Sequence, residues 1–153
     1  PEELVGEAPR LAALLRRHRG AESEPGLVHG DFVYGNLLFA GCAVAAVLDW
    51  EIAQIGQPLL DLGSLCVIAK RHDFKDDPNP SGSVQVGVDW LLDVYGGAGP
   101  EITWFVALSY YKYAAIFGYN LMLHRRGKRH DPIYERMPGT IEGLLAAGVE
   151  LLA

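Results

Sequence analysis

Three side chains that offer oxygen ligands stand close together early in the chain: Asp31, Asn36 and Asp49. Asp31 follows His-Gly, Asn36 follows Asp31 after four intervening residues, and Asp49 follows a run of small apolar residues. Carboxylate and amide oxygens are hard ligands, and Mg²⁺ prefers a few such ligands together with the phosphates of a substrate. No soft ligand set competes in this stretch of sequence, so the pattern indicates a magnesium site.

Short apolar runs on either side of these residues predict the strands that hold them in place. The run that ends at Val28 predicts a short buried strand leading into the polar loop that contains Asp31 and Asn36. After this loop the pattern predicts a β-hairpin whose return strand ends at Asp49, which brings Asp49 back toward the loop. The expected strand, tight turn and return strand are 37–39, 40–42 and 44–48.

These blocks resemble the catalytic core of the aminoglycoside phosphotransferase family, which shares its architecture with protein kinases. The resemblance rests on His-Gly-Asp at 29–31, on Asn36 and on the hydrophobic hairpin that ends in Asp49. The segment 49–63, which begins Asp-Trp-Glu and ends Asp-Leu-Gly, is similar to the branch of that family found fused to acyl-CoA dehydrogenases. Positions 25–66 carry the resemblance strongly and the rest of the chain carries it weakly.

The resemblance implies a role for each of these residues. Asp31 would be the catalytic carboxylate that accepts or orients the hydroxyl of a phosphate acceptor, and His29 would orient the same loop. Asn36 and Asp49 would hold Mg²⁺ against the phosphates of ATP or GTP. Asp61 would be a structural acid that hydrogen-bonds back to the loop. Because phosphoryl transfer depends mostly on positioning and charge neutralisation, an orienting carboxylate is sufficient.

Each residue also has a purely structural interpretation. Asp31 can bond its own backbone, as in an Asx turn, and Asn36 can cap the loop. Asp49 can simply terminate a strand. Asp61 falls in the first turn of an expected helix, where an acid interacts favourably with the helix dipole. For Asp61 and His29 the structural interpretation is the preferred one.

The sequence before Leu27 does not contain the elements that clamp a nucleotide. Residues 1–19 predict one amphipathic helix, and no Gly-rich turn between strands precedes the His-Gly-Asp loop. The chain also begins at Pro1 without a Met. We therefore expect residues 1–153 to form the carboxy-terminal lobe of a longer, here truncated, protein whose nucleotide-binding amino-terminal lobe is absent. Alone, this lobe is expected to turn over little or no ATP.

The remainder of the chain predicts a helical scaffold. A polar, Pro-rich loop at 72–82 could admit substrate or simply be solvated, and Thr140 is expected to cap the last helix. The expected helices are 58–71, 83–95, 100–126 and a last one that starts at Pro138.

Candidate acceptor-pocket residues are fewer and rest on weaker patterns. Tyr110, Tyr113 and Asn120 lie on the long aromatic helix, where a tyrosine offers apolar area with a polar tip. Glu51 could face substrate or solvent. The basic run 124–130 is explained by favourable charge at a helix end and a solvated loop in preference to a phosphate or CoA site.

Composition places the chain among compact globular domains. It has 153 residues, half of them hydrophobic, and none of its apolar runs reaches the length of a membrane span. The net charge of −6 argues against nucleic acid as a partner and is compatible with a cationic acceptor. Cys42 and Cys66 lie in apolar contexts, which favours buried free thiols in a reducing cytoplasm. An apolar surface that normally meets another lobe would favour homodimers.

Together these features predict an α+β, mostly helical fold of the protein-kinase-like carboxy-terminal type, built around a short catalytic β-hairpin. The expected function is Mg²⁺-dependent transfer of the γ-phosphoryl group of ATP or GTP to a small-molecule hydroxyl. The acceptor could be an aminoglycoside, an amino alcohol, a sugar or a hydroxyacyl compound. Two other classes stay open: a non-catalytic binding or regulatory module of the pseudokinase type, and a metal-dependent phosphohydrolase.

Overall fold

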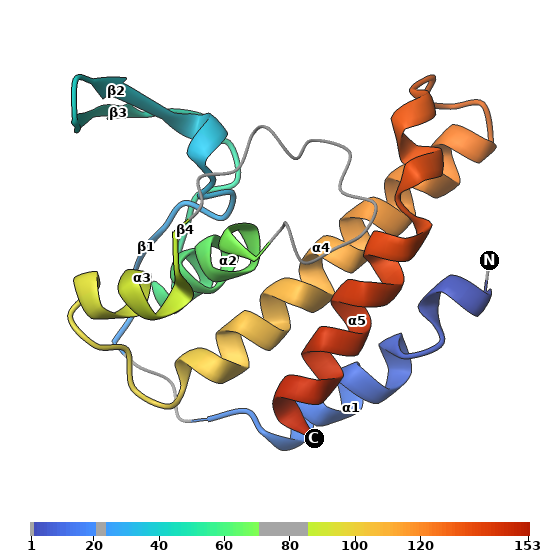
Figure 1. The fold of residues 1–153 in the computed structure, drawn as a ribbon, viewed down its shortest axis with the longest axis horizontal. Helices are drawn as coiled ribbons and strands as arrows, with labels where there is room; N and C mark the ends of the chain where they lie inside the picture. Colours follow the sequence, from blue (N-terminus) through green and yellow to red (C-terminus); the bar gives the residue numbers. More distant parts are fainter. Residues whose placement is uncertain (1, 21–23, 71–85) are drawn as a thin grey trace.

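The computed structural model describes residues 2–20, 24–70 and 86–153, and it shows an α+β fold that is mostly helical (Figure 1). The loop expected at 72–82 lies outside the described residues. The elements, in chain order, are the 3₁₀ helix η1 (Glu2–Val5), α1 (Ala8–Arg17), β1 (Gly26–Val28), the 3₁₀ helix η2 (Tyr34–Asn36), β2 (Leu37–Ala40), β3 (Ala43–Val47), β4 (Gln54–Gly56), α2 (Leu59–Ala69), α3 (Val88–Val94), α4 (Ile102–Arg125), the 3₁₀ helix η5 (Pro132–Arg136) and α5 (Pro138–Leu152).

Helix α4 forms the centre of the helical part and packs against α5, α2 and α1. In Figure 1 it crosses the molecule diagonally, with α2 on one side and α5 on the other. The side chain of Trp104 ties α4 to α1, because its indole N–H donates a 2.8 Å hydrogen bond to the carbonyl oxygen of Leu15. The apolar positions expected to face inward on α5 are all buried: Ile141, Leu144, Leu145, Val149 and Leu152.

Helices α2 and α4 approach each other closely at Gly63. A Cβ atom at this position would lie 2.6 Å from the carbonyl oxygen of Phe105, closer than real Cβ atoms approach other atoms. Glycine is therefore the residue that permits this helix spacing. A separate apolar cluster fills the interface beside it and consists of Leu59, Leu62, Cys66 and Ile102.

The strands form two small antiparallel pairs. Strands β2 and β3 make the predicted hairpin, with Leu37 opposite Val47 and an irregularity between Leu38 and Phe39. This hairpin projects from the helical body (Figure 1). Strand β1 pairs with β4, a strand that the sequence pattern did not predict, with Val28 opposite Gln54. The second pair closes the chain around the loop that contains Asp31.

Several expectations about local structure were wrong. Within residues 2–19, where one helix was expected, the chain forms a 3₁₀ turn followed by α1, and α3 begins only at Val88. Thr140 lies inside α5, where its hydroxyl is buried without a hydrogen-bond partner, so it does not cap the helix. Cys42 is exposed in the hairpin turn, whereas Cys66 is buried as expected.

Across the described helices, none is long and apolar enough to cross a membrane.

Candidate active site

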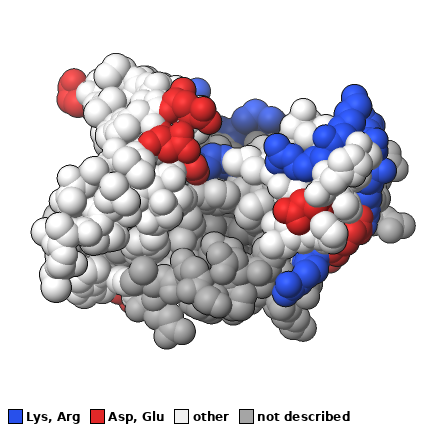
Figure 2. Space-filling model, turned by 90° about the horizontal axis from the view of Figure 1, so that it is seen from above, with Lys and Arg blue, Asp and Glu red and all other residues white. Residues whose placement is uncertain are grey.

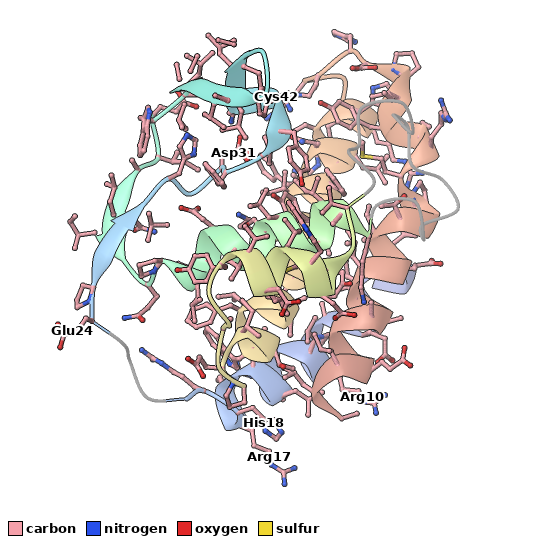
Figure 3. The ribbon with its side chains drawn as sticks, turned by 60° about the vertical axis from the view of Figure 1, so that its left-hand side comes forward. Arg10, Arg17, His18, Glu24, Asp31 and Cys42 are labelled. Atoms are coloured by element: carbon pink, nitrogen blue, oxygen red, sulfur yellow. The ribbon has the colours of Figure 1, made fainter. Side chains whose placement is uncertain are left out.

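The loop between β1 and η2 carries Asp31 and has an unusual backbone. It leaves the fully buried Val28 and turns at Gly30, whose φ of +87° lies in the left-handed region that favours glycine. A Cβ at Gly30 would also meet the carbonyl oxygen of Ile52 at 3.0 Å. This turn places Asp31, which is partly buried, beneath the base of the projecting hairpin (Figure 3).

His29 fixes the loop through both of its ring nitrogens. The Nδ1 atom accepts a 3.2 Å hydrogen bond from the backbone N–H of Asp31, so the ring hydrogen is on Nε2, which donates to the carbonyl oxygen of Leu48 at 2.7 Å. The ring is buried and packs at a centroid distance of 4.6 Å from Trp50 and 5.8 Å from Phe32. His29 therefore connects the loop with the end of the hairpin.

Asp61 holds the same loop from helix α2. One carboxylate oxygen accepts from the backbone N–H of His29 at 2.7 Å, and the other accepts from the backbone N–H of Gly30 at 2.9 Å. Hydrogen bonds to an ionised carboxylate are roughly twice as strong as neutral ones. Both oxygens of Asp61 are thus engaged with the loop backbone.

Asn36 directs its amide donor toward Asp31. Its Nδ2 atom lies 2.9 Å from the backbone oxygen and 3.2 Å from the carboxylate oxygen Oδ2 of Asp31. Because the donor end of the amide is committed to Asp31, the oxygen end is the one that can serve a cation. The carboxylate of Asp31 is thereby oriented by the side chain of Asn36. In an Asx turn it would instead be bonded to its own backbone.

Asp49 is brought to this loop by the backbone of Leu48. The N–H of Leu48 donates to the carbonyl oxygen of Asn36 at 2.8 Å, and its own carbonyl accepts from His29. Asp49 follows directly, is exposed, and has a φ of +62°, the one positive value among the described non-glycine residues. Aspartate is one of the few residues that tolerate this conformation, which is found mostly at turns and functional sites.

The donors at this site match a hard divalent cation. An amide oxygen from Asn36 and a carboxylate from Asp49 are the ligand types that Mg²⁺ takes when substrate phosphates and water complete its shell. Among the residues that the structure describes, no group of three or more His, Cys, Asp or Glu side chains is placed to hold a metal ion.

Lys112 is a site residue that the sequence reasoning missed. Its Nζ atom donates to the carbonyl oxygen of Gly30 at 3.0 Å and to the hydroxyl of Ser64 at 2.9 Å. Burial lowers the pKa of Lys112, and the charges of Asp31 and Asp61 oppose that shift. A signal was present in the sequence, because Lys112 is the sole charged residue within the long aromatic segment 102–123.

The four residues predicted for an acceptor pocket lie in different surroundings. Tyr110 and Tyr113 are buried in the helical core, and the ring of Tyr113 lies 4.9 Å from the Nζ atom of Lys112, which bonds to Gly30 of the loop. The side-chain oxygen of Asn120 accepts a 2.7 Å hydrogen bond from Arg129. Glu51 is exposed next to the hairpin. Of the four, Glu51 is the nearest in sequence to the loop residues described above.

Charge is divided between two parts of one face. Figure 2 shows acidic side chains gathered near the base of the hairpin and basic side chains over the far end of α4. At that end Arg125 makes two hydrogen bonds, of 2.8 and 2.7 Å, to the carboxylate of Glu135. This pairing lowers the pKa of Glu135 and raises the pKa of Arg125. Part of the basic run is therefore paired within the protein itself.

Comparisons with known proteins place these features in a family. The chain is 33% identical over 116 residues to acyl-CoA dehydrogenase family member 11 of Rattus norvegicus, and 40% identical over 60 residues to family member 10 of Mus musculus. The two alignments cover 67% and 38% of this chain, but only 15% and 6% of the respective relatives.

A solved structure shows the same fold. It comes from Ralstonia eutropha and is described as a candidate aminoglycoside phosphotransferase; it superposes with a TM-score of 0.75 at 19% identity. The match covers 97% of this chain and 49% of that one. The model of the phosphotransferase enzyme family matches residues 1–96, which include the whole His-Gly-Asp loop, the hairpin and Asp61. The chain therefore belongs to the phosphotransferase enzyme family.

Proposed function

We propose that this chain provides the acceptor and metal side of an enzyme that transfers the γ-phosphoryl group of ATP or GTP to the hydroxyl of a small molecule. The observation that carries the proposal is the pairing of Asn36 with Asp31, in which the amide donates to both the backbone and the carboxylate of Asp31. One side chain thereby orients the carboxylate and presents an oxygen beside it. This is the arrangement needed where a hydroxyl and a metal-bound phosphate must meet.

Each residue contributes through its position. Asp31 would accept a hydrogen bond from the acceptor hydroxyl and aim its oxygen toward the phosphorus atom. Asn36 and Asp49 would hold Mg²⁺, which neutralises charge on the phosphates when it is bound. Because His29 and Asp61 fix the backbone on either side of Gly30, Asp31 is held in place before substrate arrives. Such preorganisation is the main contribution a protein makes to phosphoryl transfer.

The class of acceptor is the finer part of the proposal. Aminoglycosides, amino alcohols, sugars and hydroxyacyl compounds all carry a suitable hydroxyl. The names of the relatives refer to acyl-CoA dehydrogenases, and this favours a hydroxyacyl compound over an antibiotic as the physiological acceptor. The chain spans about 15% of the length of the first of these relatives, so the activity is proposed for the whole protein in which it occurs.

The test uses the full-length protein that contains this chain. It measures Mg²⁺-dependent transfer of radiolabel from [γ-³²P]ATP to a panel of hydroxyl acceptors drawn from these four classes. Asp31→Ala should lower the rate by about 10²–10⁴-fold, the range for loss of a positioned acid–base group. The control is Asp93→Ala, which removes an exposed acid from α3. The proposal fails if no acceptor is labelled, or if Asp31→Ala transfers phosphate as fast as the control.

A further inference from the structure

Lys112 reaches the Asp31 loop from the middle of α4, and this contact joins parts of the chain that are far apart in sequence. The 3.0 Å bond from its Nζ atom to Gly30 links residues 82 positions apart, and the 2.9 Å bond to Ser64 links α4 to α2. Ser64 is itself tied to its helix, because its hydroxyl also lies 3.0 Å from the carbonyl oxygen of Leu60. Lys112 is thus the link between two helices and the loop.

The contact with Gly30 completes a grip on both peptide groups around this residue. The N–H of Gly30, in the peptide before its Cα, donates to the carboxylate of Asp61. The carbonyl of Gly30, in the peptide after its Cα, accepts from the ammonium of Lys112. That second peptide also contains the N–H of Asp31, which donates to His29. The carboxylate of Asp61 and the ammonium of Lys112 therefore fix the two peptide planes that flank Gly30, and these planes set the position of the Asp31 backbone.

If position 112 served only to pack the helices together, a lysine there would lower stability relative to an apolar residue. Its neighbours on α4 are aromatic and apolar, and burial disfavours its charged form. A partly buried charge is often worse for stability than an apolar side chain of similar volume. The ammonium makes hydrogen bonds to the loop and to Ser64 and lies 4.9 Å from the centre of the Tyr113 ring, and an apolar side chain could make none of these contacts.

We propose that Lys112 is a positioning residue for Asp31: together with Asp61 it clamps the peptides on both sides of Gly30 and makes the orientation of Asp31 depend on the packing of α2 against α4. Its effect on catalysis rests on the proposed phosphotransferase function. Its effect on the loop does not, since the contacts exist in the chain itself.

The test compares Lys112→Met with Lys112→Arg. Methionine keeps the length and apolar stem of lysine without the donor, and arginine keeps a donor and the charge. Amide hydrogen exchange of Gly30 and Asp31 should be at least tenfold faster in Lys112→Met, while the amides of α5 should exchange as in the unmodified protein. Lys112→Arg should restore at least half of the lost protection. Should Lys112→Met fail to fold, Lys112→Gln, a neutral donor, should give a smaller acceleration at the same two amides.

In the protein encoded in full, Lys112→Met should lower kcat for transfer from [γ-³²P]ATP by about 10–100-fold and change KM for ATP by less than threefold. A purely structural role would not produce that split together with rescue by arginine. If Gly30 and Asp31 exchange at the unmodified rate in Lys112→Met, or in Lys112→Gln where the Met variant does not fold, the proposal is overturned whatever the activity. If the loop amides respond as expected but the unmodified protein transfers no phosphate, the clamp stands and the proposed function fails.

Discussion

Replacing Gly63 by alanine should disturb the candidate active site from a distance. The added methyl group would lie 2.6 Å from the carbonyl oxygen of Phe105, about 0.8 Å short of the 3.4 Å at which ordinary van der Waals contact begins. The obstacle is backbone, which cannot rotate away, so α2 and α4 must separate. The bond between Lys112 and Ser64 is 2.9 Å long, and a shift of this size would carry it beyond hydrogen-bonding distance.

The magnitude follows from two opposing effects. Alanine is favoured over glycine inside a helix by about 0.8–1 kcal/mol, whereas overpacking costs about 1–3 kcal/mol. Gly118 offers a matched control, because it lies in α4 and a Cβ there would meet nothing within 4 Å. Gly118→Ala should therefore show only the gain in stability that comes from the higher helix propensity of alanine. Gly63→Ala should be less stable than Gly118→Ala by about 1–3 kcal/mol, or about 2–12 °C in Tm for a domain of this size.

Urea unfolding measures the difference directly, and amide exchange at Gly30 reports on the loop. A second comparison is Gly148→Ala, in which the new methyl would overlap the end of the Leu11 side chain at 2.6 Å and touch the Cβ of Tyr110 at an ordinary contact distance of 3.4 Å. Because a side chain can adopt another rotamer, this variant should fall between the other two. The reasoning is refuted if Gly63→Ala unfolds at the same urea concentration as Gly118→Ala, or if its loop amides exchange at the unmodified rate.

Three further predictions concern the loop, the metal ligand and the thiols. Asp61→Asn should destabilise the chain by about 1–3 kcal/mol in urea unfolding, because an amide cannot accept from both loop N–H groups and leaves one unsatisfied; a midpoint equal to that of Asp93→Ala would contradict this. Asp49→Asn keeps a residue that tolerates positive φ, so stability should change little, while the Mg²⁺ concentration needed for half-maximal transfer should rise at least tenfold; an identical Mg²⁺ titration would exclude Asp49 as a ligand. Burial raises the pKa of Cys66 to about 11, so its thiol should remain protonated at pH 8.5. At that pH iodoacetamide should modify the exposed Cys42 and leave Cys66 unmodified, which mass spectrometry can measure. As pH rises from about 9 toward 11, the buried thiol should reduce stability, because the native state holds its proton more tightly than the unfolded state does; Cys66→Ala should remove that loss, and an unchanged pH profile would argue against it.

The parts of the site that the sequence predicted are those built from local pattern. The hairpin followed from alternating apolar runs around a turn, and it is found at β2 and β3. The inward face of α5 followed from helical spacing. In both cases residues close in sequence determine the outcome, so periodicity was sufficient information. The proximity of Asp49 to the loop also followed, because a hairpin returns the chain to its starting point.

The parts that the sequence did not predict depend on long-range packing. Strand β4 has three residues and forms only because β1 is there to pair with it. The rotation of α4 about its axis decides that Lys112 faces the loop while Tyr110 faces α5. An aromatic helix with apolar residues on several faces does not reveal this angle. Thr140 resembled a cap by residue type, but Pro138 begins the helix two residues earlier.

The rigidity of the site comes from helices although its residues lie on a loop between strands. A two-stranded ribbon such as the pair β1 and β4 is marginally stable by itself, and the hairpin β2–β3 projects away from the helical body. Three side chains fix the loop: Asp61 of α2, Lys112 of α4 and His29, which belongs to the loop itself. Two of these three come from helices whose spacing is set by Gly63, so the precision of Asp31 depends on the α2–α4 interface more than on either pair of strands. Substitutions in that interface should therefore alter the loop before they unfold the domain, and substitutions at the exposed tip of the hairpin should do neither.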